Sequence, residues 1–168
     1  MSESHAQKPE EVTYGPILGA QVHMTSGSDP AEIGKAFGTA FGKLVGYIQA
    51  TGAQPQGPPR AIYTAYGPGE TAFTVVMPLA SGAEGGTPDG SVVVDEVPGG
   101  RALRFVHLGP YEKLRDTYGD ITNWMIKNGR MESGSDWEKY TPMWEEYVSD
   151  PDSTPPDELV THIYLPLA

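Results

Sequence analysis

An internal repeat constrains what this chain can fold into more than any other feature of its sequence. Short segments recur in the same order in the two halves of the chain. The matched pairs are Val22-His23-Met24 with Val106-His107-Leu108, Tyr63 with Tyr147, and Val76-Met77-Pro78-Leu79-Ala80 with Tyr164-Leu165-Pro166-Leu167-Ala168. These matches indicate a duplication, with pseudo-repeats at about residues 12–80 and 101–168.

Each repeat is expected to contain a strand, a helix and two further strands. In the second half, the apolar run over residues 101–108 predicts a buried strand that ends at Gly109-Pro110. Apolar and aromatic side chains then recur at three- and four-residue steps up to Asn128-Gly129, which predicts an amphipathic helix. In the first half, Asp29-Pro30 predicts a helix start, and the helical spacing continues to Gly52. The other expected strands cover residues 12–24, 61–66, 71–79, 91–97, 142–148 and 159–167.

This pattern favours an α+β fold. Two strand-helix-strand-strand units would join into one antiparallel sheet, with two long helices packed on it and a central ligand cleft between the two halves. The polar residues 1–11 are expected to be disordered, so residues 12–168 are expected to form the domain.

The first predicted helix carries a stripe of glycines at every fourth position, namely Gly34, Gly38, Gly42 and Gly46. Each glycine inside a helix costs about 1 kcal/mol relative to alanine. We therefore expect close packing of another backbone against this side of the helix. The packing would lie within the monomer or, alternatively, at a subunit interface of a homodimer. A third alternative is that the stripe reflects only a compositional drift toward glycine and alanine.

Charge and composition exclude several classes of function. The chain of 168 residues carries 22 acidic against 11 basic side chains, a net charge of −11. Binding to DNA depends on basic side chains that displace counterions, so direct nucleic-acid binding is not expected. No apolar run is long enough for a membrane span, and the N-terminus is too polar for a secretory signal. The cytoplasm is therefore the expected compartment.

Motifs in the second half resemble the GyrI-like small-molecule-binding family. This module also forms the effector-binding domain of AraC- and MerR-type multidrug-responsive regulators. The resemblance implies a duplicated, tandem SHS2-like architecture, and it covers the second half of the chain better than the first. The matching residues are Val106-His107-Leu108-Gly109-Pro110-Tyr111, Tyr118, Trp124, Glu145-Glu146-Tyr147, Asp150-Pro151, Thr161 and Leu165-Pro166-Leu167.

Metal ions and cofactors are not expected. The chain has no cysteine and no HExxH, P-loop or GxGxxG pattern. His23 and His107 occupy matching positions in the repeat, which favours a structural role at the ends of two strands. A distant likeness of the fold to SOUL-type haem-binding proteins leaves haem ligation by His107 or His162 as a weaker alternative.

The strand over residues 142–148 carries the leading candidate site. Period-two alternation puts Met143, Glu145 and Tyr147 on one face, and Trp144, Glu146 and Val148 on the other face. A carboxylate between Met143 and Tyr147 would be partly desolvated, which raises its pKa or makes it seek a cation. In the family, the glutamate of the corresponding motif faces the ligand cleft, and Glu145 matches it. We expect Glu146 to be an exposed surface charge.

Aromatic residues are expected to line the cleft around Glu145. One negative charge among aromatic faces suits flat apolar or cationic compounds, through stacking and cation–π attraction. Packing in the core is the alternative for each ring. The candidate lining residues are Tyr147, Trp124, Tyr118, Tyr111 and Tyr63, with Met143.

Three functions are compatible with such a site. The first is a stand-alone effector-binding domain, which would need a protein partner for any transcriptional role. The second is a hydrolase of cyclopropane-bearing DNA-alkylating natural products, with Glu145 and Tyr147 as acid/base groups, because some members of the family have this activity. The third is an acidic inhibitor of DNA gyrase.

Overall fold

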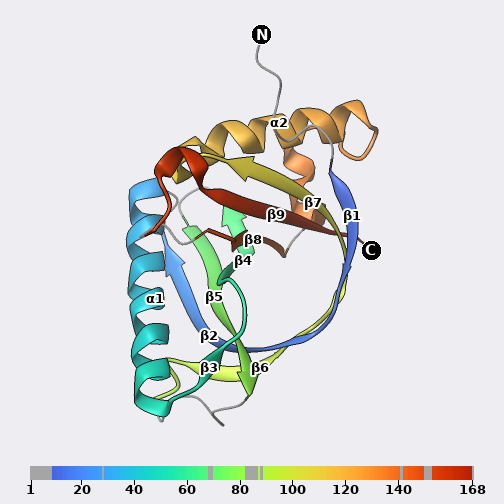
Figure 1. Ribbon diagram of the computed structural model, residues 1–168. Coiled ribbons are helices and arrows are strands. Elements are labelled where there is room, and N and C mark those ends of the chain that lie inside the picture. Colours follow the sequence, from blue (N-terminus) through green and yellow to red (C-terminus); the bar gives the residue numbers. More distant parts are fainter. Residues whose placement is uncertain are drawn as a thin grey trace. The chain divides into compact units, whose positions relative to one another are not determined.

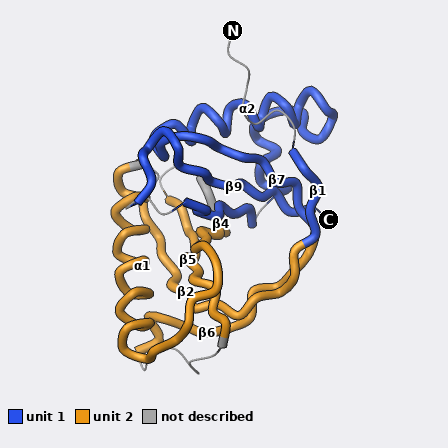
Figure 2. Tube along the Cα trace, in the orientation of Figure 1, with its two compact units in different colours: residues 1–13, 101–168 blue, residues 14–100 orange. Residues whose placement is uncertain are grey.

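The computed structural model describes residues 9–27, 29–67, 70–81, 87, 89–140, 142–149 and 153–167. The chain divides into two compact units (Figure 2). Unit 1 contains residues 1–13 and 101–168, and unit 2 contains residues 14–100.

Unit 2 holds one long helix and a sheet of antiparallel strands (Figure 1). Its strands pair in the order β4-β5-β2-β6, and the short β3 pairs with β5. The elements are β2 (Ile17–Ser26), α1 (Pro30–Thr51), β3 (Gln54–Pro55), β4 (Arg60–Gly67), β5 (Glu70–Ser81) and β6 (Val93–Val97).

Unit 1 repeats this arrangement with a second helix. Its strands pair in the order β8-β9-β7-β1, and β9 runs antiparallel to both β7 and β8. The elements are β1 (Glu10–Tyr14), β7 (Gly100–Leu108), η1 (Tyr111–Lys113), α2 (Leu114–Lys127), η2 (Gly134–Tyr140), β8 (Met143–Tyr147), η3 (Pro156–Glu158) and β9 (Val160–Leu167).

The two units share one topology. In unit 2 the chain runs β2-α1-β4-β5, and in unit 1 it runs β7-α2-β8-β9. The strand orders β4-β5-β2-β6 and β8-β9-β7-β1 correspond position by position. The predicted α+β fold of duplicated strand-helix-strand-strand units is therefore confirmed.

Local sequence signals set the ends of α1. The Asp29 side chain accepts a hydrogen bond from the amide of Ala31 at 3.0 Å, as expected of an N-cap residue. The helix ends at Gly52, whose φ of 73° lies in the left-handed region that glycine adopts without strain. Its apolar side, which includes Ala40 and Leu44, packs against the buried side chains of β2 and β5.

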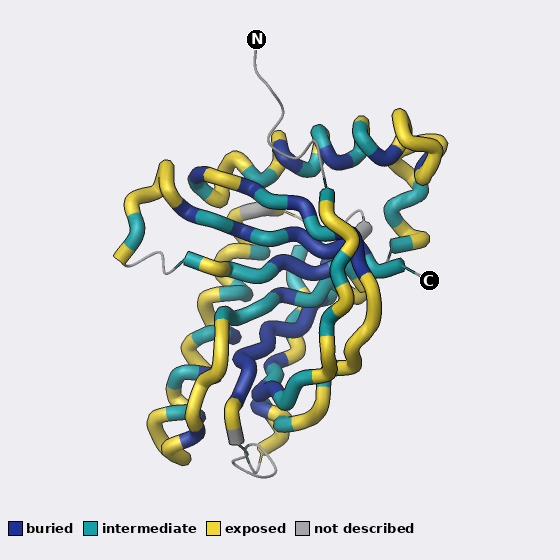
Figure 3. The backbone as a smooth tube through the Cα atoms, turned by 45° about the vertical axis from the view of Figure 1, so that its right-hand side comes forward, coloured by how far each residue is buried: buried dark blue, intermediate teal, exposed yellow. Residues whose placement is uncertain are grey.

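The core of unit 1 lies between α2 and its sheet. Ile121 and Met125 of α2 are fully buried against Phe105, Ile163 and Leu165 of the sheet. Figure 3 shows the buried positions following the strands, whereas the outer sides of both helices are largely exposed.

The glycine stripe of α1 does not pack as expected within the monomer. Gly34, Gly38, Gly42 and Gly46 are all exposed, and a Cβ atom built at any of them would meet no atom within 4 Å. The expectation of close packing inside the monomer was therefore wrong, because the apolar residues of α1 lie on its opposite side. The subunit interface stays a prediction.

The N-terminal segment differs from expectation at its end. Residues 1–8 lie outside the described part of the chain, but Glu10 and Glu11, which we expected to be disordered, belong to β1. Each pairs with an arginine of the neighbouring β7: Glu11 contacts Arg101 at 2.6 Å, and Glu10 contacts Arg104. The strand therefore starts two residues before its predicted position.

The resemblance residues Asp150-Pro151 and the last residue of the repeat, Ala168, lie outside the described residues. Within the described part of the chain, neither helix has the length and apolar character needed to cross a membrane.

Candidate functional site

The carboxylate of Glu145 is enclosed within unit 1. Oε1 accepts a hydrogen bond of 2.5 Å from the hydroxyl of Tyr147, and Oε2 accepts one from the hydroxyl of Tyr118 on α2. Glu145 lies opposite Ile163 of β9, a member of the unit 1 core. The carboxylate therefore points to the side of β8 that α2 covers.

Burial dominates the electrostatics of Glu145. The residue is 5% exposed, and this desolvation raises the pKa of its carboxyl above the ordinary value. The two tyrosine hydroxyls and the nearby His107 act in the opposite direction and only partly offset it. Among the described residues, no ion pair includes Glu145. Two neutral donors therefore satisfy this carboxylate without neutralising its charge.

Three of the predicted lining residues lie near one another in unit 1, next to Glu145. Tyr111 packs edge-on against Tyr147 with ring centroids 5.7 Å apart, and Tyr147 and Tyr118 both hold Glu145. Tyr111 is 36% exposed, so this end of the cluster reaches the surface.

The other predicted lining residues contact the cores. Trp124 packs edge-on against Phe105 at 5.7 Å, and Met143 packs against the same unit 1 core. Tyr63 belongs to unit 2, where its ring lies 5.6 Å from that of Phe73. Because Tyr63 lies in the other unit, its place in the site stays a prediction.

Trp137 was missed by the sequence analysis. It lies in η2, its ring centroid is 5.6 Å from that of Tyr118, and its Nε1 donates to the hydroxyl of Thr122 at 2.9 Å. It therefore supports one of the two tyrosines that hold Glu145. The irregular segment around it has no periodicity that could have predicted this position.

The buried His107 holds the end of β7 to the segments that follow it. Its Nε2 lies 3.0 Å from the carbonyl oxygen of Pro110, which can only accept a hydrogen bond. In the neutral ring, Nδ1 is then the acceptor for the hydroxyl of Thr117, at 2.5 Å. Both nitrogens are engaged, and the ring joins the end of β7 to the turn and to α2. The repeat mate, His23, also contacts a threonine hydroxyl through Nδ1, but this threonine, Thr74, lies opposite it on the paired strand β5.

Glu146 is not the exposed charge that we expected. Its side chain is 15% exposed and accepts a hydrogen bond of 2.9 Å from the hydroxyl of Tyr164. Nδ1 of His162 lies 3.3 Å from its Oε1. Burial and the Glu146 carboxylate together raise the pKa of Tyr164 to about 12. The expectation was wrong because Tyr164 and His162 of the adjacent strand β9 lie beside Glu146 on this face of the sheet.

The same face carries a stacked aromatic pair. Trp144 and Tyr164 lie directly opposite each other on β8 and β9, with ring centroids 4.8 Å apart and planes 13° apart. Glu145 and Glu146 therefore occupy two different aromatic environments, one on each face of β8.

The chemistry that these groups can perform follows from the carboxylate and its two phenols. Among the described residues, no three His, Asp or Glu side chains come together as a metal site. A buried carboxylate held by two phenols can accept a cation in exchange for one hydroxyl, or it can exchange a proton with a bound molecule.

Comparisons with known proteins place the fold. The C-terminal domain of EcmrR superposes with a TM-score of 0.74 at 15% identity, covering 96% of this chain and 97% of that one. The structure of SAV2435 bound to tetraphenylphosphonium superposes with a TM-score of 0.63 at 9% identity, and the match covers 96% of this chain and 94% of that one. The structure of a hydrolase encoded by lin2189 from Listeria innocua superposes with a TM-score of 0.58 at 14% identity, and the match covers 98% of this chain and 94% of that one.

No curated protein matches the sequence. The sequence model of the GyrI-like small molecule binding domain, however, matches residues 25–168. This match spans most of the chain and includes all of β8 and its site residues. The chain therefore belongs to the GyrI-like small-molecule-binding family.

Proposed function

We propose that this GyrI-like domain binds flat apolar or cationic compounds, and that Glu145 supplies the negative charge of the site. One observation carries the proposal: the buried carboxylate is held by two neutral tyrosine hydroxyls and by no cationic side chain of the described residues. A buried, uncompensated charge is costly, so a cationic ligand would relieve this cost.

The aromatic rings give such a ligand a route to the carboxylate. Tyr147 lies between Glu145 and the partly exposed Tyr111. A ligand that displaces the Tyr147 hydroxyl would meet Oε1 directly and would lie against both tyrosine rings. Each cation–π contact of this kind contributes about 0.5–2 kcal/mol.

A relative supports the preference for cations. SAV2435, which shares the fold, has been solved with tetraphenylphosphonium, an apolar cation. The cleft between the two halves, with Tyr63, Trp124 and Met143 in its lining, stays a prediction. A cytoplasmic location also stays a prediction. The same holds for a protein partner that would convert ligand binding into a transcriptional response.

Hydrolysis is the second candidate function. Burial raises the pKa of Glu145, and the hydroxyl of Tyr147 lies 2.5 Å from it, so the two groups make a pair that can exchange a proton with a bound molecule. With a cyclopropane-bearing DNA-alkylating compound, Glu145 would take a proton from water as the water oxygen attacks a ring carbon. The ring C–C bond would break and its electrons would pass into the conjugated system of the compound. Glu145 would then give its proton to that system, so that the product is the compound with one added water. The likeness to the lin2189 hydrolase is compatible with this reaction.

Thermal unfolding and mass spectrometry separate these functions. The wild type, Glu145→Gln and Glu146→Gln are heated with tetraphenylphosphonium, with ethidium and with a cyclopropane-bearing alkylator, which is then recovered. Glu146→Gln is the matched control, because it removes the same charge from the other face of β8. A ligand at 100 times its Kd stabilises by about 2.7 kcal/mol.

A shift that Glu145→Gln abolishes and Glu146→Gln preserves supports the binding site. Recovery of the alkylator with one added water, lost in Glu145→Gln, identifies a hydrolase. A shift that survives Glu145→Gln contradicts the assignment of this carboxylate. If no compound shifts the wild type and none is converted, the small-molecule proposal fails and the gyrase-inhibitor hypothesis is tested next.

A further inference from the structure

Basic side chains gather around a hollow on unit 1. The hollow has a volume of about 520 Å³, within the range of small-molecule sites. Arg101 of β7, Arg130 after the end of α2 and Lys139 of η2 contribute to its lining. Three of only 11 basic residues in a chain of net charge −11 therefore come together from three separate segments of the chain.

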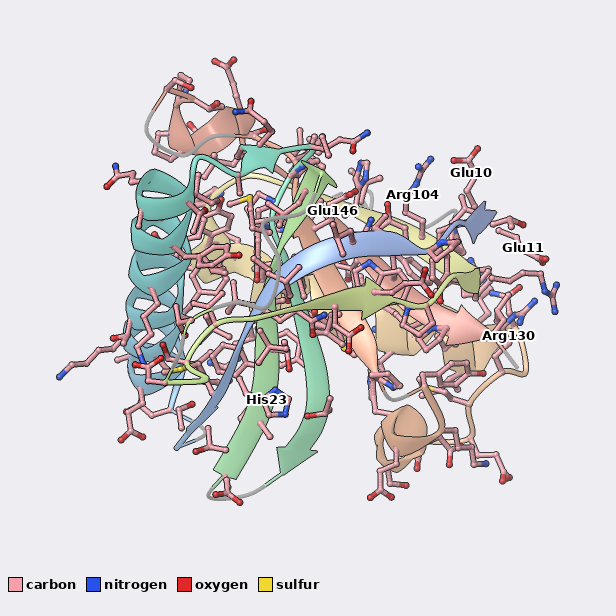
Figure 4. All side chains as sticks on the ribbon, turned by 90° about the horizontal axis from the view of Figure 1, so that it is seen from below. Glu10, Glu11, His23, Arg104, Arg130 and Glu146 are labelled. Atoms are coloured by element: carbon pink, nitrogen blue, oxygen red, sulfur yellow. The ribbon has the colours of Figure 1, made fainter. Side chains whose placement is uncertain are left out.

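The arginines differ in what they already bind. Arg101 holds the carboxylate of Glu11, which also lines the hollow, at 2.6 Å. Among the described residues, the guanidinium of Arg130 makes no ion pair and no hydrogen bond, although its backbone carbonyl accepts from Tyr140. Figure 4 shows Glu11 and Arg130 on the same side of unit 1. A guanidinium presents donors in a planar fork that fits carboxylate and phosphate oxygens.

The ammonium group of Lys139 makes one ion pair and can bind a further acceptor. Its Nζ lies 3.4 Å from Asp136, and that carboxylate also accepts the amide of Glu132 at 2.7 Å. The Lys139 side chain is highly exposed, so its ammonium has donors left for a further oxygen. The hollow is therefore lined by three cations and by one carboxylate, that of Glu11, while Asp136 contacts Lys139 from outside the lining.

The remaining lining residues add apolar side-chain surface. Tyr140, Pro166 and Leu167 complete the wall. A bare inorganic anion would use only the cations, whereas an anion with an apolar body would also cover these side chains.

From these contacts we infer a second ligand site, which takes a small organic anion with a carboxylate or phosphate group on an apolar body. The anion bridges Arg101 and Arg130, and Glu11 occupies one arginine until the ligand displaces it. The Glu11–Arg101 pair is half exposed on both sides, and exposed ion pairs of this kind are weak and exchangeable. This site selects the opposite charge from Glu145 and does not depend on the function proposed above.

The test is calorimetric titration at fixed ionic strength with 1-naphthyl phosphate and 1-naphthoate, and with neutral 1-naphthylmethanol for comparison. We expect both anions to bind and the alcohol not to bind. Comparison of the two anions shows which head group the site prefers. Arg130→Gln should weaken binding about tenfold or more, because it removes a charge-assisted hydrogen bond. Glu145→Gln should leave anion binding unchanged, which separates this site from the proposed function.

Glu11→Gln gives the sharper result, because removing the internal competitor should tighten binding several-fold. Glu10→Gln is the matched control: it makes the same change of net charge one residue away, where the carboxylate pairs with Arg104 instead. Equal tightening by both variants would reduce the effect to general charge and overturn the site. The site would also be overturned if Arg130→Gln bound the two anions as tightly as the wild type does. It would be overturned as well if neither the wild type nor Glu11→Gln bound either anion. Circular dichroism checks that each variant is folded.

Discussion

The hydroxyl of Tyr147 lies 2.5 Å from Oε1 of Glu145, two positions earlier on the same face of β8. The other oxygen is held from α2 by Tyr118. A strand and a helix are thus joined through a single buried carboxylate. A ligand that displaces Tyr147 would contact the same carboxylate that Tyr118 holds, so we expect ligand binding to affect the contact between α2 and β8.

The raised pKa of Glu145 predicts a pH-dependent contribution to stability. Because burial raises this pKa above 4.5, the folded protein keeps the proton to a higher pH than the unfolded chain does. The contribution of Glu145 to the free energy of unfolding therefore declines as the pH rises from about 4.5 through the folded-state pKa. Glu145→Gln cannot titrate, so its stability relative to the wild type should increase over that range. Urea unfolding from pH 4.5 to 8 measures this difference, and parallel profiles would contradict it.

The hydrogen bond between Thr117 and His107 predicts a large effect of a conservative substitution. Thr117→Val keeps the shape of the side chain but leaves Nδ1 of a histidine that is 2% exposed without its donor. We expect a loss of about 1–3 kcal/mol in the free energy of unfolding. Thr39→Val is the control, because the Thr39 hydroxyl bonds the carbonyl of Lys35 at an exposed position of α1. It should change stability by less than about 0.5 kcal/mol.

The exposed glycines of α1 predict an easy gain in stability. Gly38→Ala and Gly42→Ala add a methyl group that meets no atom within 4 Å, so each should stabilise the protein by about 0.5–1 kcal/mol. Gly52→Ala should instead destabilise it, because φ is 73° at that residue. Thermal unfolding with light scattering compares the three variants. Destabilisation by Gly38→Ala, together with loss of a dimer, would favour the subunit interface.

The sequence was sufficient for features that depend on local periodicity. The repeat around His23 and His107 predicted two units of one topology, and the alternation along β8 put Glu145 and Tyr147 on one face. The cover of Glu146 could not be predicted in this way, because it depends on the register that brings Tyr164 and His162 of β9 beside it. Such a register is fixed by pairing between distant segments.

Two further features lay beyond local patterns. The cost of the glycines in α1 was correctly recognised, but the sequence did not show that their side of the helix is open. The pairing of Glu10 and Glu11 with arginines of β7 joins residues about ninety positions apart, so the polar N-terminus resembled a disordered segment.

Trp137 predicts a spectroscopic signal for the proposed site. Its ring centroid is 5.6 Å from that of Tyr118, so a cation that reaches Glu145 and moves Tyr118 should change the emission of Trp137. The fluorescence change on titration with tetraphenylphosphonium should be lost in Trp137→Phe. It should persist in Trp144→Phe, because Trp144 stacks on Tyr164 on the other face of β8.

The reverse result has an equally definite meaning. If Trp144→Phe removes the signal and Trp137→Phe keeps it, the ligand lies on the face that carries Glu146 and the stacked rings. The buried carboxylate of Glu145 would then serve only to hold α2 to β8 through its two tyrosines.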